Sequence, residues 1–165
     1  VHPGKDSGHC VWDWLPDAWM AEPKYFDKDH WHETEVFQNA HVKEEYDWVI
    51  GELDRLLRRH GYVRNGLFYR VVAPNEDTIV LFCHFGVECV LLSYLLNISP
   101  MQLWHGTCAA PSSVTVLCTE ERRSGVASFR MSSFGDVSHL YAGGREPSFA
   151  ARFCEVYTRF DQRHD

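Results

Sequence analysis

The sequence predicts an α/β domain in which helices flank a mostly parallel central sheet. Three observations support this prediction. Apolar residues recur at the 3.6-residue spacing of a helix over residues 43–60. Residues 78–83, TIVLFC, form a continuous apolar run of β-forming residues, as in a central strand buried on both faces. Residues 113–119 and 126–133 are two further strand-like runs. Because helical and strand-like segments alternate along the chain, a layered α/β domain is expected.

Length and charge limit the choice of protein class. The chain has 165 residues, 45% of them hydrophobic, which suits one domain over residues 1–165 with a substantial core. Its formal net charge is -7 and its pI about 5.8. Proteins that bind nucleic acid or anionic membranes need a basic patch, and no run approaches the roughly 18 apolar residues of a membrane span. We therefore expect no nucleic-acid or membrane partner.

The cysteines indicate the cellular compartment. None of them forms a CxxC pair, and their spacing is irregular. They are Cys10, Cys83, Cys89, Cys108, Cys118 and Cys154. Several lie inside apolar runs, as buried free thiols do. A reduced, cytoplasmic protein is the expectation.

Residues 1–42 are irregular, rich in aromatic residues and histidine, and are predicted to form an insert or lid on a core made by residues 43–165. Three tryptophans of this insert favour a packing cluster over a ligand box: Trp12, Trp14 and Trp19. In the alternative they form an aromatic wall over a ligand, with Asp13 and Asp17 as its nearest contacts. His30 and His32 raise the further alternative of a metal site, but no HExxH or CxxC partner accompanies them, so no metal or cofactor is expected.

The helix predicted over residues 43–60 runs into Arg59-His60-Gly61. An Arg-His-Gly triplet marks a catalytic histidine only where a buried strand precedes it. Here a helix precedes it, basic residues suit the negative helix end, and Gly61 suits a left-handed cap. His60 is therefore predicted to end a helix. The following residues predict a hairpin around Asn65-Gly66.

Three more elements follow from local signals. The run after Gly86, VECVLLSYLLN, has helical spacing. Ser99 and Pro100 predict the cap and first turn of another short helix. A final helix is predicted over residues 147–161.

The loop His84-Phe85-Gly86 is the predicted functional site. It joins the apolar run 78–83 to the helix that begins after Gly86. A ligand there meets the carboxyl end of a strand and the free amides of a helix N-terminus, and both features recur in phosphate sites. A histidine in such a loop can neutralise a phosphoryl oxygen during phosphoryl transfer.

Residues 77–140 resemble the histidine phosphatase (phosphoglycerate mutase-like) family. TIVLFCHFG resembles the strand that ends in the family's second histidine. SSVTVLCTEE resembles its next strand, and VASFRMSSFGDVSHL resembles its closing strand and the short stretch that follows. Phe85 departs from the commoner His-Gly pair of the family.

The resemblance implies a three-layer phosphoglycerate mutase-like fold whose N-terminal part is missing, and the start at Val1 without a methionine agrees with that expectation. It implies a phosphohistidine mechanism on a small phosphorylated metabolite, in which His84 binds the phosphoryl group with Phe85 and Gly86 in its loop. No motif supplies the phosphorylated histidine, the arginines or the acid, so an upstream segment is expected to carry them. An incomplete sheet exposes a pairing edge, so the partner is an upstream segment or a second copy. The alternative is a non-catalytic binding module.

Overall fold

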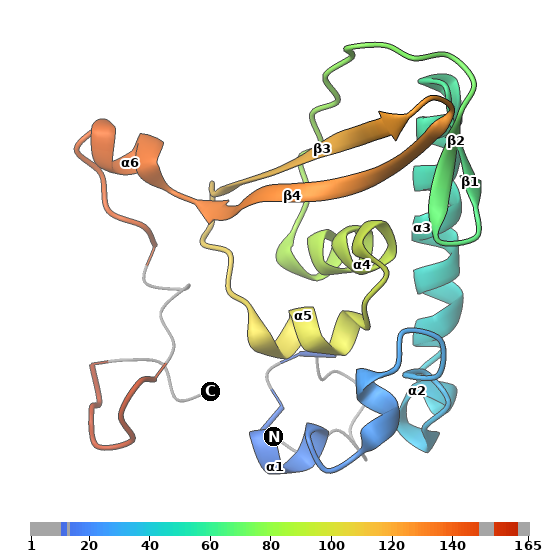
Figure 1. The fold of residues 1–165 in the computed structure, drawn as a ribbon. Coiled ribbons are helices and arrows are strands. Elements are labelled where there is room, and N and C mark those ends of the chain that lie inside the picture. The colour runs from blue at the N-terminus through green and yellow to red at the C-terminus, as the bar shows by residue number, and fades with distance from the viewer. Residues whose placement is uncertain (1–10, 13, 149–153, 162–165) are drawn as a thin grey trace.

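The computed structural model describes residues 11–12, 14–148 and 154–161. Six α-helices, one 3-10 helix and four strands lie within them (Figure 1). In chain order these are α1 (Pro16–Trp19), η1 (Pro23–Phe26), α2 (Glu35–Asn39), α3 (Val42–Arg59), β1 (Tyr62–Asn65), β2 (Phe68–Val71), α4 (Phe85–Leu96), α5 (Pro100–Gly106), β3 (Val114–Arg123), β4 (Val126–Asp136) and α6 (Ser138–Ala142).

The sheet is antiparallel throughout, so the predicted three-layer fold with a mostly parallel sheet is wrong. Its strand order is β1-β2-β4-β3, and each neighbouring pair is antiparallel. The cause lies in the connections. Two-residue turns join β1 to β2 and β3 to β4, and such turns permit only antiparallel pairing, whereas parallel strands need a long crossover. Gly66 and Gly125 supply the positive φ values, 62° and 81°, that these turns require.

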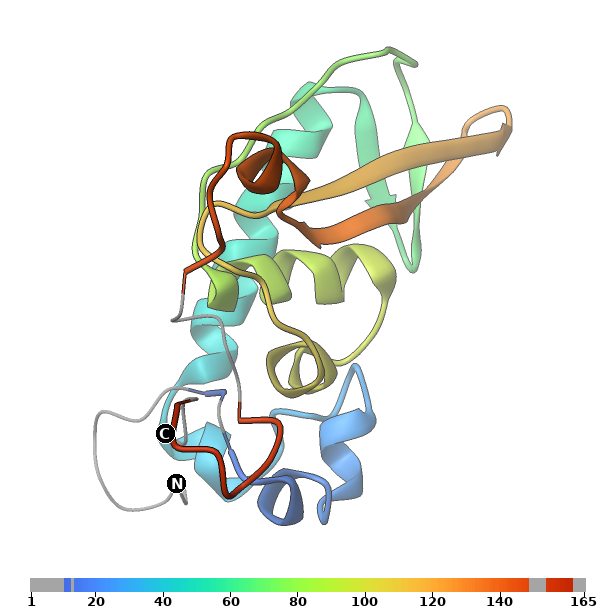
Figure 2. The same cartoon turned by 90° about the vertical axis from the view of Figure 1, so that its left-hand side faces the viewer.

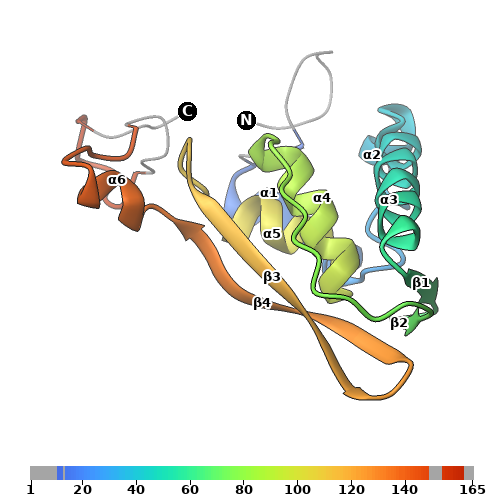
Figure 3. The same ribbon diagram turned by 90° about the horizontal axis from the view of Figure 1, so that it is seen from above.

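Residues 78–83, called here the open segment, do not form the predicted buried central strand. They are exposed, and Phe82 keeps 97% of its surface. No backbone hydrogen bond ties them to another described residue. In Figures 1 and 3 the chain leaves β2, loops over the top of the molecule and descends across α4 to its first turn. The run has strand-forming residues, but it pairs with no strand in the part of the chain that the structure describes.

Most predicted helices are confirmed. Helix α3 ends at Arg59, and Gly61 takes the left-handed conformation with φ 84°. Helix α4 covers the run after Gly86, and the Ser99 side chain caps α5 by accepting from the Met101 amide at 3.3 Å. The final helix predicted over residues 147–161 is wrong for 147–148 and 154–161, which are not helical.

Elements α1, η1 and α2 lie at the end of the molecule opposite the sheet (Figure 2), and they share an aromatic core with α3, α4 and α5. Its buried residues are Trp14, Trp19, Tyr25, Trp31, Phe37, Tyr46, Cys89, Val90, Leu92, Met101, Leu103 and Trp104. The Trp31 ring contacts the rings of Phe37 and Tyr46 edge-on, each at 5.2 Å between centroids. The predicted packing cluster is thereby confirmed for Trp14 and Trp19, and the region predicted as an insert supplies much of the core.

A second cluster, the sheet-side core, joins α3 and α4 to the sheet. It consists of Leu53, Leu57, Tyr62, Tyr69, Leu95 and Ala127. In the part of the chain that the structure describes, no helix has both the length and the apolar character needed to cross a membrane.

Candidate functional site at the start of helix α4

His84 is the N-cap of α4, the twelve-residue helix that follows the open segment. Its backbone is extended, with φ -107° and ψ 158°, and its carbonyl accepts the first helical hydrogen bond from the Glu88 amide at 2.9 Å. The side chain does not bond to the helix, and the residue is exposed. The imidazole is thus free to meet a ligand beside the unbonded amides of the first helical turn.

Two tryptophans fix the backbone after His84. A side chain at Gly86 would place its Cβ 2.5 Å from the Trp12 ring, so a larger residue would force that ring to move. The Trp104 indole N–H donates to the Gly86 carbonyl at 3.1 Å. The Phe85 ring meets Trp12 edge-on at 6.2 Å between centroids. Phe85 and Gly86 therefore hold the loop in position and leave His84 as its one exposed functional side chain.

The charges around His84 are sparse. None of the hydrogen bonds and ion pairs of the described residues joins His84 to an arginine, a second histidine or a carboxylate. Glu88 lies in the first turn of α4 and opposes an anion there. A phosphate at this loop would be held by His84 and backbone amides unless another segment supplied cations.

Cys83 precedes His84 and is exposed, although its place in an apolar run predicted a buried thiol. Neighbouring protein atoms desolvate its thiol and, with Glu88, raise its pKa above the usual value. A thiol with a raised pKa is a poor nucleophile. The structure therefore favours His84 over Cys83 for chemistry at this loop.

The Arg59-His60-Gly61 triplet ends a helix, as predicted. His60 is the C-cap of α3, and its Nδ1 lies 2.6 Å from the Asp77 carboxylate. The Asn75 amide donates to the His60 carbonyl at 2.6 Å. His60 thus fastens the chain before the open segment to the end of α3.

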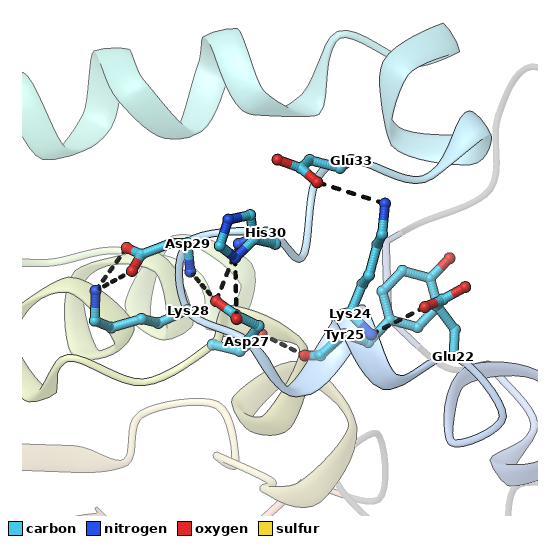
Figure 4. Close-up of polar contacts among 9 residues, drawn as sticks. Glu22, Lys24, Tyr25, Asp27, Lys28, Asp29, His30 and Glu33 are labelled. Carbon is cyan, nitrogen blue, oxygen red and sulfur yellow. Dashed lines mark hydrogen bonds and ion pairs between the residues drawn. The ribbon is translucent and has the colours of Figure 1, made fainter.

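His30 has a local carboxylate partner, whereas His32 has none among the described residues. Asp27 accepts from the amides of Asp29 and His30 at 2.8 and 3.2 Å, and its other oxygen lies 3.0 Å from His30 Nδ1 (Figure 4). The Asp29 amide and then His30 lower the Asp27 pKa, while Asp27 raises the His30 pKa. His32 Nδ1 is buried without a hydrogen bond, and burial lowers its pKa. Among the residues described, no three His, Cys, Asp or Glu side chains gather as metal ligands would.

A cavity of about 380 Å³ lies away from His84, among the 28–32 loop, α3, α4 and the β1–β2 turn. Its lysines are already paired with carboxylates. Lys28 lies 2.6 Å from Asp29, and Lys43 lies 2.5 Å from Asp47. These lysines therefore offer a phosphate little free positive charge.

Sequence reasoning missed the polar network at the edge of this cavity. The Arg64 guanidinium lies 4.2 Å from the Tyr94 ring centroid and donates to the Asn97 side-chain oxygen at 2.5 Å. The Tyr94 hydroxyl donates to Asp54 at 2.7 Å. Burial is the main cause that raises the pKa of Tyr69, to about 12. The sequence signal for this network was an arginine in the hairpin, Arg64, and a tyrosine in the helical run, Tyr94. A contact between such residues indicates packing, and only the fold brings them together.

The remaining candidates stay outside the His84 loop. Asp17 is exposed on α1, and Asp13 lies outside the described residues. His105 bonds the Met101 carbonyl through Nδ1 at 2.9 Å, a contact within α5. His139 is exposed on α6, and its ring makes no hydrogen bond with a described residue.

Comparison of the chain with family models, curated proteins and solved structures finds no match.

Proposed function

We propose that this chain takes part in phosphomonoester hydrolysis, with His84 as the histidine that binds the phosphoryl group. The observation that supports this is the exposed His84 imidazole at the N-cap of α4, next to helix amides that have no partner within the helix. A phosphoryl oxygen would accept from the imidazole N–H and from the amides, and this positioned charge stabilises the transition state. The substrate class is a small phosphorylated metabolite.

The proposal requires groups that the described residues do not bring to His84. A phosphohistidine mechanism needs a second histidine as nucleophile, arginines to neutralise the phosphoryl oxygens and an acid to protonate the leaving group. A further segment, on this polypeptide or on another, has to bring them. The proposal rests on the His84 loop and on the sequence resemblance. The antiparallel sheet does not support it.

The experiment compares His84→Ala with His41→Ala. His41 is the matched control because it is also an exposed N-cap histidine, at the start of α3. The assay uses the complete protein together with the segment that supplies these groups. We expect its wild type to hydrolyse a phosphomonoester panel, His84→Ala to lose about 10²- to 10³-fold in turnover, and His41→Ala to keep wild-type turnover. Circular dichroism checks that both variants fold. Equal turnover in wild type and His84→Ala would remove His84 from the mechanism.

A second candidate is a non-catalytic phosphate-binding module. The absence of an arginine partner for His84 among the described residues favours it. In that case wild-type protein binds inorganic phosphate in calorimetry, His84→Ala does not, and neither hydrolyses the panel.

We also propose a cytoplasmic location. Cys83, Cys89 and Cys118 are free thiols, as a reducing compartment maintains them. Alkylation of intact cells before lysis, followed by mass spectrometry, tests this: reversible oxidation of these thiols in the cell would contradict it.

A further inference from the structure

The open segment, residues 78–83, is an apolar run of β-forming residues that belongs to no sheet among the described residues. Its central side chains are exposed to different degrees: Ile79 36%, Val80 69%, Leu81 50% and Phe82 97%. The segment contains neither proline nor a charged residue. Its backbone makes no hydrogen bond to any other described residue. An uncharged row of β-forming residues with unpaired amides and carbonyls is a template for strand pairing.

Contacts on both sides of the open segment fix its two ends. Before it, His60 bonds the Asp77 carboxylate at 2.6 Å, and the Asn75 side chain bonds the His60 carbonyl. After it, the chain enters α4 at Phe85, where Trp12 and Trp104 fix the first turn. A segment held at both ends loses less conformational entropy when it pairs.

Charge selects the orientation of the pairing strand. Glu76 and Asp77 precede the open segment, and His84 follows it. Glu76 and His84 are both exposed, and neither has an ion-pair partner among the residues of known placement. Antiparallel pairing of two such strands sets the acidic end of each against the histidine end of the other, whereas parallel pairing sets like ends together.

We propose that a second copy of this chain covers the open segment, and that the two copies pair antiparallel in the register centred on Val80, which sets Glu76 of each copy opposite His84 of the other. The interface is isologous, because the same residues face each other across a two-fold axis. Pairing fills the backbone hydrogen bonds along one edge of each segment and covers apolar side chains such as Val80 and Leu81. This inference is independent of the proposed hydrolysis, since it is tested by mass and not by turnover.

Sedimentation velocity over a concentration series tests the proposal with Val80→Lys and Trp48→Lys. Trp48 is the matched control because it is an apolar side chain on α3 that is 65% exposed, and its replacement changes the charge equally. We expect wild type and Trp48→Lys to form a species of twice the 19.2 kDa chain mass. We expect Val80→Lys to weaken the dimer at least tenfold while its circular dichroism stays unchanged.

Charge reversal tests the antiparallel orientation. Glu76→Lys is expected to weaken the dimer, and adding His84→Glu to the same chain is expected to restore it. Hydrogen exchange is expected to slow at residues 78–83 as the dimer forms. A wild type that stays monomeric at every concentration, or a dimer that Val80→Lys leaves intact, would overturn the proposal. A monomer that captures a strand from a different polypeptide would overturn it equally.

Discussion

Helix α4 and the open segment follow each other directly in the chain, and both are apolar, yet they have opposite fates. Cys89 and Leu92 of α4 are 0% and 2% exposed, whereas Phe82 in the open segment is 97% exposed. A helix bonds its own backbone, so α4 needs only a surface to pack on. A strand needs a neighbour for its backbone as well. The two hairpins pair with each other and leave the open segment without one. Apolar composition therefore indicates a tendency toward burial, and the topology of the chain decides whether a strand-like segment has a neighbouring strand to pair with.

The largest expected difference between these two regions is in thiol reactivity. Desolvation raises the pKa of both thiols, that of Cys89 to about 12, but Cys83 is exposed whereas Cys89 is 0% exposed and out of a reagent's reach. A raised pKa reduces the thiolate fraction at any pH below it, so alkylation accelerates as pH rises. At about pH 8 we expect Cys83 to be alkylated in the folded protein and Cys89 only after denaturant is added. Peptide mass spectrometry reads each site. Equal labelling rates in the folded state would show that α4 opens freely.

Matched removal of aromatic side chains is expected to give the next largest difference. Trp31 is 1% exposed and contacts three aromatic rings of the core, so Trp31→Ala should lower the free energy of unfolding by about 3–5 kcal/mol. Phe82→Ala removes an exposed ring and should change it by less than about 0.5 kcal/mol. Urea denaturation at a protein concentration that keeps the chain monomeric measures both. A large loss for Phe82→Ala would mean that the open segment packs in solution.

The smallest expected effect concerns the anchor of the open segment. At Gly61, which has φ 84°, a Cβ would lie 2.3 Å from the Ala73 carbonyl oxygen. Gly61→Ala should therefore lower the free energy of unfolding by about 2 kcal/mol and speed hydrogen exchange at residues 73–77. Gly51 in α3 has open space around it, so Gly51→Ala is the control and should raise stability by about 0.5–1 kcal/mol. If both variants behaved alike, the contact between Gly61 and Ala73 would not hold the segment.

Local structure was predictable from the sequence wherever the signals were local. The helical spacing ending at Gly61, the Ser99 cap and the hairpin glycine each act within a few residues, and all are confirmed. The sheet was not predictable in this way, because strand orientation depends on which distant segments meet. The open segment failed for the same reason: TIVLFC has the residues of a buried strand, but its burial depended on a neighbour.

The candidate site shows the same limit. The N-cap position of His84 followed from the step between an extended run and a helix. The contacts around the His84 loop could not be predicted in this way, because Trp12 and Trp104 reach Gly86 from distant parts of the chain. The Arg64 network also depended on contacts between β1 and α4 that no local spacing reveals.

The β2–β4 junction has a consequence for the order in which the chain folds. Two residue pairs join these strands, Tyr69 with Ala127 and Arg70 with Val126, and the Tyr69 ring is covered by Phe129 at 5.2 Å between centroids. The β1–β2 hairpin closes from near neighbours, but its cover is far along the chain, and distant contacts form slowly. On the ribosome, Tyr69 therefore emerges long before β4 does, and the sheet-side core is completed only when that strand has been synthesised.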